Sequence, residues 1–106
     1  MAQLGTMNLL GANTVINPLS KIGDGVIINT GAIVEHDCTI GNFVHIAPGA
    51  VLAGNVSVGD FTFIGAGAVV KQGVNICNSV IIGAGAVVVK SITEPGTYIG
   101  IPAQKI

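Results

Sequence analysis

The stretch that decides the fold is VGDFTFIGAGAVV, residues 58–70. Within it the aliphatic residues Val58, Ile64 and Val70 lie six positions apart, and a glycine follows each of the first two. Four positions after each of those two comes a small or β-branched residue. A period of six fits neither the 3.6-residue period of a helix nor the simple alternation of a two-faced strand.

The same six-residue period runs outward from this stretch through almost the whole chain. Every sixth residue from residue 4 to residue 88 is aliphatic: Leu4, Leu10, Ile16, Ile22, Ile28, Val34, Ile40, Ile46, Leu52, Val58, Ile64, Val70, Ile76, Ile82 and Val88. The small position is occupied by Thr14, Ser20, Ala32, Cys38, Ala50, Thr62, Ala68 and Ala86. Such self-similarity is typical of a solenoid. Asn8 and Ile92, which stand at the small position of the end units, are expected to belong to capping units.

A short strand followed by a tight corner explains this period, because one aliphatic side chain per unit then points inward. Three such units close one triangular coil, so that the fifteen units make five coils. Stacked coils pair as parallel strands about 4.8 Å apart. Small residues at the inner corners leave no room for large rings, which explains why only 4% of the residues are aromatic.

The composition excludes several classes of protein. The chain has 106 residues, of which 50% are hydrophobic and 8% charged, which is typical of one folded domain rather than a disordered segment. Four lysines, no arginine and five acids leave a formal charge of −1, so we expect no nucleic-acid partner. No apolar run of about 18 residues and no signal peptide are present, so we expect no membrane partner and a cytoplasmic location. Cys38 and Cys77 are expected to be buried, reduced thiols.

The repeat resembles the hexapeptide-repeat, left-handed β-helix family over nearly the whole chain. The left hand is what this resemblance implies, since general rules for parallel crossovers favour the right hand. The ending GIPAQK, residues 100–105, resembles the Gly-x-Pro-Ala ending of the acyltransferase branch. We therefore expect an all-β left-handed parallel β-helix, a triangular prism of about five coils forming a single domain over residues 1–106. The repeats are expected over residues 4–93 and a short tail over residues 94–106.

Because three units of six complete one coil, side chains 18 positions apart are expected to stack in columns along the prism. One column reads Pro18, His36, Gly54, Gln72 and Lys90. The glycine beside His36 is expected to leave space and to expose an N–H group that a carbonyl could approach. Lys90 is expected about 14 Å from His36, from the strand spacing, which suits an extended ligand with its phosphate near Lys90.

The adjoining column contains Ala66 and Ala84, which are small enough to let such a ligand lie flat.

The segment Glu35-His36-Asp37 is the strongest candidate for acid–base chemistry, because it holds two of the five acids and one of the two histidines. A carboxylate beside an imidazole fixes its tautomer and raises its basicity, as a general base requires. Alternation along a strand prevents both acids from holding the ring in the same way, and a solvated polar corner is the alternative. His45 lies half a coil away, so the two histidines are expected to meet only between subunits of a trimer. An interface histidine is the alternative for His45.

Residues 28–38, 43–45 and 52–56 are similar to the group of sialic-acid O-acetyltransferases and bacterial nucleotide-amino-sugar N-acetyltransferases. The resemblance implies that His36 is the general base and that Asp37 increases its basicity. It also implies acetyl-CoA contacts from His45 and from backbone groups at three small residues, Gly54, Ala66 and Ala84. Asn29 matches a polar residue near the same cleft, and we expect Asn29 and Glu35 on its substrate side.

These observations predict an acetyl-CoA-dependent O- or N-acetyltransferase acting on a sugar or a nucleotide-linked amino sugar, in a cleft of a homotrimer. Transfer is expected to be direct, with no metal and no acyl-enzyme, so Cys38 is not expected to be a nucleophile. The zinc site of a γ-type carbonic anhydrase needs three histidines, and this chain has two. Relatives carry an N-terminal Rossmann-like domain for the sugar nucleotide, which is expected to be absent because the repeat begins at Leu4. A trimeric scaffold that has lost this domain is the alternative function.

Overall fold

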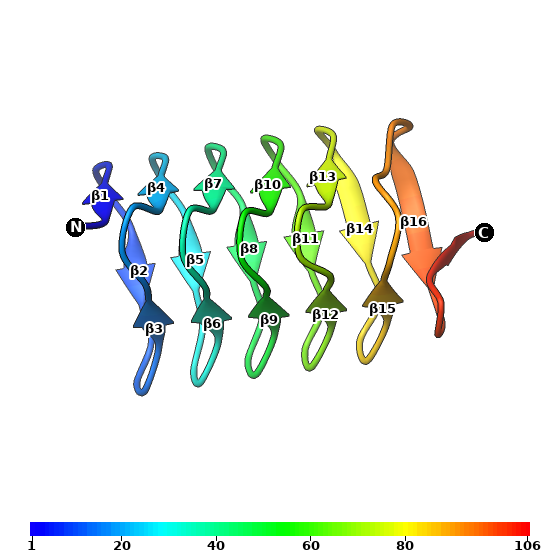
Figure 1. Ribbon diagram of the computed structural model, residues 1–106, viewed down its shortest axis with the longest axis horizontal. Helices are drawn as coiled ribbons and strands as arrows, with labels where there is room; N and C mark the ends of the chain where they lie inside the picture. The colour runs from blue at the N-terminus through cyan, green and yellow to red at the C-terminus, as the bar shows by residue number, and fades with distance from the viewer.

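The computed structural model describes all residues 1–106 and contains seventeen short strands in three sheets (Figure 1). Sheet A comprises β1 (Gln3–Leu4), β4 (Lys21–Ile22), β7 (Thr39–Ile40), β10 (Ser57–Val58) and β13 (Asn75–Ile76). Sheet B comprises β2 (Leu9–Leu10), β5 (Ile27–Ile28), β8 (His45–Ile46), β11 (Phe63–Ile64), β14 (Val80–Ile82), β16 (Gly96–Ile99) and β17 (Gln104–Lys105). Sheet C comprises β3 (Val15–Ile16), β6 (Ile33–Val34), β9 (Val51–Leu52), β12 (Val69–Val70) and β15 (Val87–Val88).

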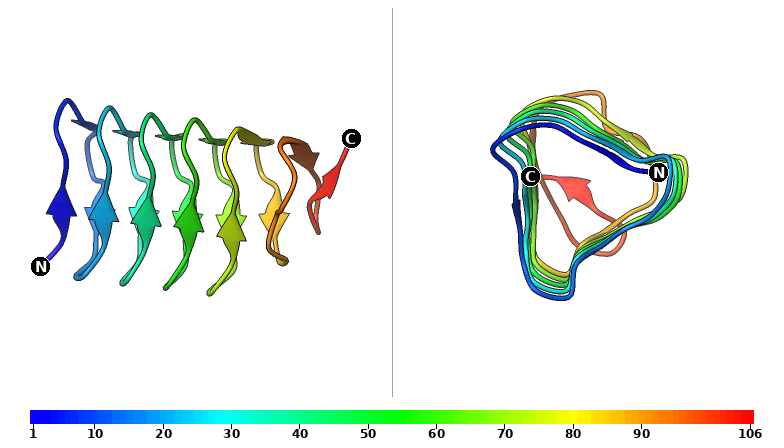
Figure 2. Two further views of the ribbon diagram at one scale, coloured as in Figure 1. Left: turned by 90° about the horizontal axis from the view of Figure 1, so that it is seen from above. Right: turned by 90° about the vertical axis from the view of Figure 1, so that its left-hand side faces the viewer.

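The stacking confirms the predicted length of the coil. Strands of consecutive coils pair in parallel with partners 18 positions apart, as in Val34 with Leu52 and His45 with Phe63. Seen along its axis the chain traces a triangle (Figure 2), and the molecule measures 34 × 22 × 21 Å. The structure is a left-handed parallel β-helix of about five coils, as expected.

The aliphatic repeat forms the interior of this prism. The last residue of each strand from β4 to β15 is buried, with no more than 4% of its surface exposed. Small residues line the inner corners, where Ala32, Cys38 and Ala50 are fully buried. Leu4 and Leu10 are exposed because they belong to the first coil, which no further coil covers on its outer side. No helix of the structure is long and apolar enough to cross a membrane.

Each corner turns in the same way. In every unit from residue 7 to residue 85, the third residue after the aliphatic one has a positive φ. Six of these residues are glycines, and the others include Asn13, Asn55 and Asp37, whose short polar side chains tolerate this conformation. We name the corners by the sheets that they connect: A–B, B–C and C–A.

The C-terminal segment closes one end of the prism. β16 continues sheet B, but there Val80 pairs with Gly96, so the regular register of the coils has ended. β17 then folds back antiparallel on β16. The Lys105 ammonium group lies 3.1 Å from the Glu94 carboxylate, and the Tyr98 hydroxyl donates to the Glu94 carbonyl. The Glu94 pairing raises the pKa of Lys105.

A ladder of Asp and Asn side chains stabilises the A–B corner. The Thr6 N–H group donates to Asp24 Oδ1, the Asp24 N–H to Asn42 Oδ1, the Asn42 N–H to Asp60 Oδ1 and the Asp60 N–H to Asn78 Oδ1. Each distance is 2.8 or 2.9 Å. Carboxylate and amide oxygens alternate in the same geometry, so the ladder requires an acceptor oxygen and no particular charge.

We predict that Asp60→Ala lowers the free energy of unfolding by about 1 kcal/mol, because the Asn42 N–H group loses its acceptor. Asp60→Asn is the matched control and should stay close to the wild-type stability, since asparagine already fills this role at two rungs of the ladder. Urea denaturation followed by circular dichroism measures both variants. Equal loss in both would show that charge rather than the acceptor oxygen stabilises the corner.

Candidate active site

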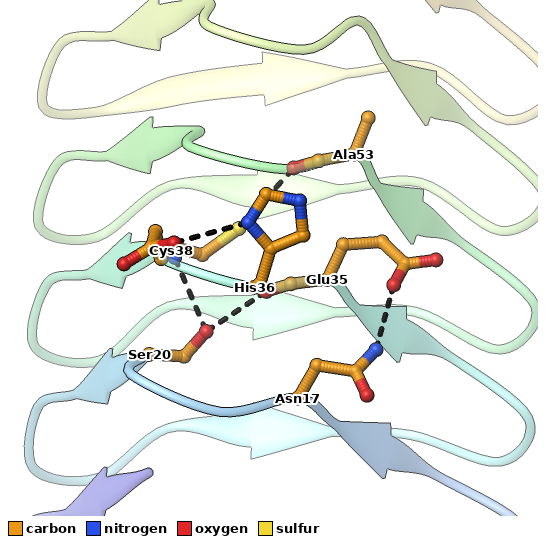
Figure 3. A network of polar contacts seen from close by, with 7 residues as sticks. Asn17, Ser20, Glu35, His36, Cys38 and Ala53 are labelled. Carbon is orange, nitrogen blue, oxygen red and sulfur yellow. Dashed lines mark hydrogen bonds and ion pairs between the residues drawn. The ribbon is translucent and has the colours of Figure 1, made fainter. Parts of the chain in front are cut away.

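His36 lies at the tip of a C–A corner, in the tight turn between β6 and β7 (Figure 3). Asp37 is the next residue of the same turn. Val34 before them and Cys38 after them are fully buried in the prism, which anchors both ends of the turn. Asp37 adopts the left-handed conformation with a φ of 60°. The turn therefore presents both side chains to solvent, with exposed fractions of 59% for His36 and 48% for Asp37.

Asp37 holds the imidazole ring, and Glu35 does not. Oδ2 of Asp37 lies 3.0 Å from Nδ1 of His36, where it accepts a hydrogen bond from Nδ1–H. The Glu35 carboxylate instead accepts a hydrogen bond of 2.6 Å from the Asn17 side chain of the preceding coil. With the proton on Nδ1, the lone pair of Nε2 is free to accept a proton. The question that the sequence left open between the two acids is resolved in favour of Asp37.

Gly54 lies next to His36 in the adjacent coil, as the column arithmetic predicted. A Cβ atom added to Gly54 would lie 2.6 Å from Nε2 and 2.7 Å from Cε1 of His36, so any other residue would displace the ring. The space that was expected to stay open for a ligand is thus filled in part by the imidazole itself. The Gly54 N–H group makes no hydrogen bond within the chain. An unpaired donor and the basic nitrogen of His36 are therefore neighbours.

A buried network supports this turn from within (Figure 3). The Ser20 hydroxyl donates to the Glu35 carbonyl at 2.8 Å and accepts from the Cys38 N–H group at 3.1 Å. The Cys38 thiol donates to the Ala53 carbonyl at 3.3 Å. Burial raises the pKa of the Cys38 thiol, against smaller opposing contributions from backbone hydrogen bonds, so the thiol stays protonated at neutral pH. This agrees with the expectation that Cys38 is not a nucleophile.

Asn17 and Ser20 were missed as site residues in the sequence. The signal was present, because Asn17 lies 18 positions before Glu35 and Ser20 lies 18 positions before Cys38. The 18-residue offset therefore places these two polar residues next to the turn that carries His36.

His45 lies on the outer face of sheet B, the side of the triangle opposite the C–A corner. The two histidines therefore do not meet within one chain, as expected. The His45 ring packs edge-on against Phe63 with ring centroids 5.0 Å apart. Its Nε2 atom is buried and has no hydrogen-bond partner. A buried polar atom is costly to leave unpaired, so this nitrogen is an unusual feature of the sheet B face.

Three other predicted residues lie at the B–C corner, one side of the prism away from His36. Ala66 and Ala84 stack in one column of this corner. Asn29 lies in a turn of the same corner, where its side-chain oxygen accepts a 2.7 Å hydrogen bond from the Thr30 N–H group. The expectation that Ala66 and Ala84 form the column adjoining that of His36 is therefore wrong, because they lie at a different corner of the triangle and do not join the His36 site within one chain.

Lys90 follows β15 in the column of His36, at the C-terminal end of the prism. It lines a hollow of about 230 Å³ together with Ser91, Thr93 and Tyr98. A second hollow is lined by Lys90, Val89 and residues 102–104. Lys90 makes no ion pair, so its charge is available to an external anion. No group of three His, Cys, Asp or Glu side chains is placed so as to hold a metal ion.

The repeat is similar to that of known transferases. Residues 19–54 match the family described as bacterial transferase hexapeptide (six repeats). A search of curated proteins gives no match.

Among solved structures, the acetyltransferase domain of PglB from Neisseria gonorrhoeae superimposes with a TM-score of 0.89 at 40% identity, covering 99% of this chain and 54% of that one. The same domain has been solved in complex with acetyl coenzyme A.

PerB from Caulobacter crescentus, solved in complex with CoA and GDP-perosamine, superimposes with a TM-score of 0.85 at 44% identity, covering 99% of this chain and 54% of that one. This chain thus spans about half the length of these relatives. The repeat, the register and these similarities agree: residues 19–54 carry the hexapeptide repeat of bacterial transferases, and the chain is similar over nearly its whole length to the acetyltransferase domain of PglB and to PerB.

Proposed function

We propose that this chain transfers an acetyl group from acetyl-CoA to the amine of a nucleotide-linked amino sugar. The observation that carries the proposal is the site at the C–A corner, where Asp37 holds Nδ1 of His36 and Nε2 lies beside Gly54, whose N–H group is unpaired. Direct acyl transfer needs these two groups, a base for the attacking amine and a donor for the oxyanion.

In the proposed reaction His36 Nε2 accepts a proton from the acceptor amine as its nitrogen attacks the thioester carbonyl. The Gly54 N–H group donates to the oxygen that becomes negative in the tetrahedral intermediate. The C–S bond then breaks, the CoA sulfur takes the proton from His36, and the amide product remains. Asp37 keeps the ring oriented and stabilises the imidazolium that forms in between.

The remaining predicted residues are proposed to bind acetyl-CoA and its acceptor across a subunit boundary. Lys90 lies in the column of His36 with no partner for its charge, which suits a phosphate group of CoA. His45, Ala66, Ala84 and Asn29 lie away from His36 in one chain, so a neighbouring subunit would supply them. Glu35, which borders His36, is proposed to face the acceptor.

The outer surfaces of the sheets support a homotrimer. The outward column of sheet A is polar and consists of Gln3, Lys21, Thr39, Ser57 and Asn75. The outward column of sheet B consists of Leu9, Ile27, His45, Phe63 and Ile81. That of sheet C consists of Val15, Ile33, Val51, Val69 and Val87. A cyclic trimer joins two different patches of its subunits, and two apolar faces beside one polar face fit that requirement.

The amino-sugar acceptor is supported by the relatives. PerB, at 44% identity, was solved with GDP-perosamine, and a variant from the same organism is described as a GDP-perosamine N-acetyltransferase. The relatives are about twice as long as this chain, so acceptor recognition is the part of the proposal that depends most on residues outside the shared region.

We predict that the wild-type chain binds acetyl-CoA in a calorimetric titration. It is also predicted to release CoA thiol in the presence of nucleotide-linked amino sugars. His36→Ala should lower kcat by about 100-fold or more, because it removes the base, while acetyl-CoA binding persists. An unmodified chain that binds no acetyl-CoA would contradict the proposal and leave a scaffold as the function.

Lys90→Ala should weaken acetyl-CoA binding about tenfold, the scale of one lost hydrogen bond to a charged group. Lys21→Ala is the control, since Lys21 is likewise an exposed lysine and lies on the polar face of sheet A. Calorimetric dissociation constants at two salt concentrations measure the effect. An equal loss in both variants would indicate a general charge effect rather than a phosphate site.

Asp37→Ala should shift the His36 ring away from the Nδ1–H tautomer, because the acceptor at Nδ1 is lost. Glu35→Gln is the control, since Glu35 binds Asn17 and not the ring. Imidazole ¹⁵N chemical shifts report the tautomer without any need for substrate. If Glu35→Gln shifts the tautomer and Asp37→Ala does not, the roles given to the two acids are wrong.

Ile81→Lys should dissociate the trimer, because it places a charge on the apolar face of sheet B, where Ile81 is 49% exposed. Thr39→Lys adds the same charge to the polar face of sheet A and should leave the trimer intact. Light scattering coupled to size-exclusion chromatography gives the mass in solution. A monomeric wild-type chain would contradict the intersubunit cleft.

A further inference from the structure

The inward column beneath the C–A corner contains two polar residues where the same column is otherwise apolar. It reads Ser20, Cys38, Val56, Val74 and Ile92 along the prism. Ser20 and Cys38 are both fully buried. A buried hydroxyl is costly unless it is hydrogen-bonded, so a serine here needs a structural reason.

Ser20 forms a bridge inside the turn that carries His36 and Asp37. Its hydroxyl donates to the carbonyl of Glu35, the first residue of the turn, and accepts from the N–H group of Cys38, the last one. No direct hydrogen bond joins the Cys38 N–H to the Glu35 carbonyl. One hydroxyl thus connects the two ends of the turn.

The turn two coils further along shows the alternative geometry. There the Val74 N–H group donates directly to the Lys71 carbonyl at 3.3 Å, and the residue beneath that turn is the apolar Val56. In the His36 turn the Ser20 hydroxyl lies between the corresponding two groups. It fixes the positions of the Glu35 carbonyl and the Cys38 N–H group through its own two hydrogen bonds.

Cys38 has the corresponding position beneath the next turn, which carries Gly54. Its thiol donates to the carbonyl of Ala53, the first residue of that turn, at 3.3 Å. No direct bond joins the Val56 N–H group to the Ala53 carbonyl. The two turns that carry the proposed base and the proposed oxyanion donor are therefore both supported by a polar side chain from the coil before.

We propose that Ser20 and Cys38 are positioning residues that set the distance between the His36 imidazole and the Gly54 N–H group. They act through their hydrogen bonds to the backbone of the two turns in which these groups lie. This inference rests on the proposed function, because it assigns these two groups to a single acetyl-transfer step. Neither residue touches the substrate or changes its covalent state.

Thr62 provides a matched control for a purely structural role. Its hydroxyl donates to the Cys77 carbonyl at 3.1 Å and accepts from the Val80 N–H group at 3.3 Å, which is the same bridge at the A–B corner. Thr62 is buried like Ser20, and its turn carries no proposed site residue. Thr62→Val and Ser20→Ala therefore remove the same interaction at two different places.

The experiment compares Ser20→Ala, Ser20→Thr and Thr62→Val in the full chain, with Cys38→Ala and Cys38→Ser as a second pair. Steady-state thiol release gives kcat and the KM for acetyl-CoA. Spectra of ¹⁵N-labelled free protein give the shifts of the Gly54 amide and the His36 ring. Should Ser20→Ala not fold, Ser20→Val replaces it, since an apolar valine is already buried at the corresponding position of a later coil, residue 56.

We expect Ser20→Ala to lower kcat about 10- to 100-fold with the KM for acetyl-CoA nearly unchanged, the scale of a misplacement of up to about 1 Å. Ser20→Thr and Cys38→Ser keep a donor and should restore most of the rate. Thr62→Val should lose a similar amount of thermal stability and keep the wild-type kcat. A wild-type kcat in Ser20→Ala, or an equal fall in Thr62→Val, overturns the proposal.

The spectra separate this inference from the proposed function. If the wild-type chain transfers no acetyl group, the proposed function fails, and the free-protein shifts alone decide the positioning role. Movement of the Gly54 and His36 signals in Ser20→Ala but not in Thr62→Val supports it. Unchanged signals in Ser20→Ala overturn it.

Discussion

The parallel hydrogen-bond ladder between coils, with its constant offset in sequence, is the constraint on which the rest of the structure depends. Backbone groups of each coil bond to those of the next one, as in the 2.8 Å bond from the Asn29 N–H to the Ile46 carbonyl. Because the offset stays constant over five coils, every side chain lies directly beside the one 18 positions away. A contact that helps one coil can therefore be repeated in the next without any change in backbone geometry.

The three corners use this stacking in different ways. At the A–B corner, Asp24, Asn42, Asp60 and Asn78 bond to the backbone of the preceding coil in one continuous ladder. At the B–C corner the turns close by direct backbone bonds, as from Ala68 N–H to the Gly65 carbonyl. The C–A corner combines two arrangements, since polar side chains support two of its turns and a direct bond closes another. The candidate active site lies at this corner.

The 18-residue offset also determines which features of the structure can be predicted from the sequence. Period and column membership depend only on the offset, so the aliphatic core, the proximity of His36 and Gly54, and the separation of His36 from His45 were all predictable. The choice between Glu35 and Asp37 was not, because it depends on the left-handed conformation of Asp37 and on the presence of Asn17 in the preceding coil. The ring filling the space above Gly54 depends on a side-chain torsion, which no periodicity encodes.

Ser20 is a polar interruption of the apolar repeat that lies beside the candidate site. An apolar residue at the position of Ser20 would be buried as Val56 and Val74 are in their own coils, but it would form no hydrogen bond to the adjacent turn. A hydroxyl there contributes less burial and is stable only because both of its hydrogen bonds are made. Both hydrogen bonds of the Ser20 hydroxyl go to the backbone of the adjacent turn, and that turn holds His36. In a fold whose stability is spread over fifteen similar units, a polar residue at a core position can be tolerated where it serves the site.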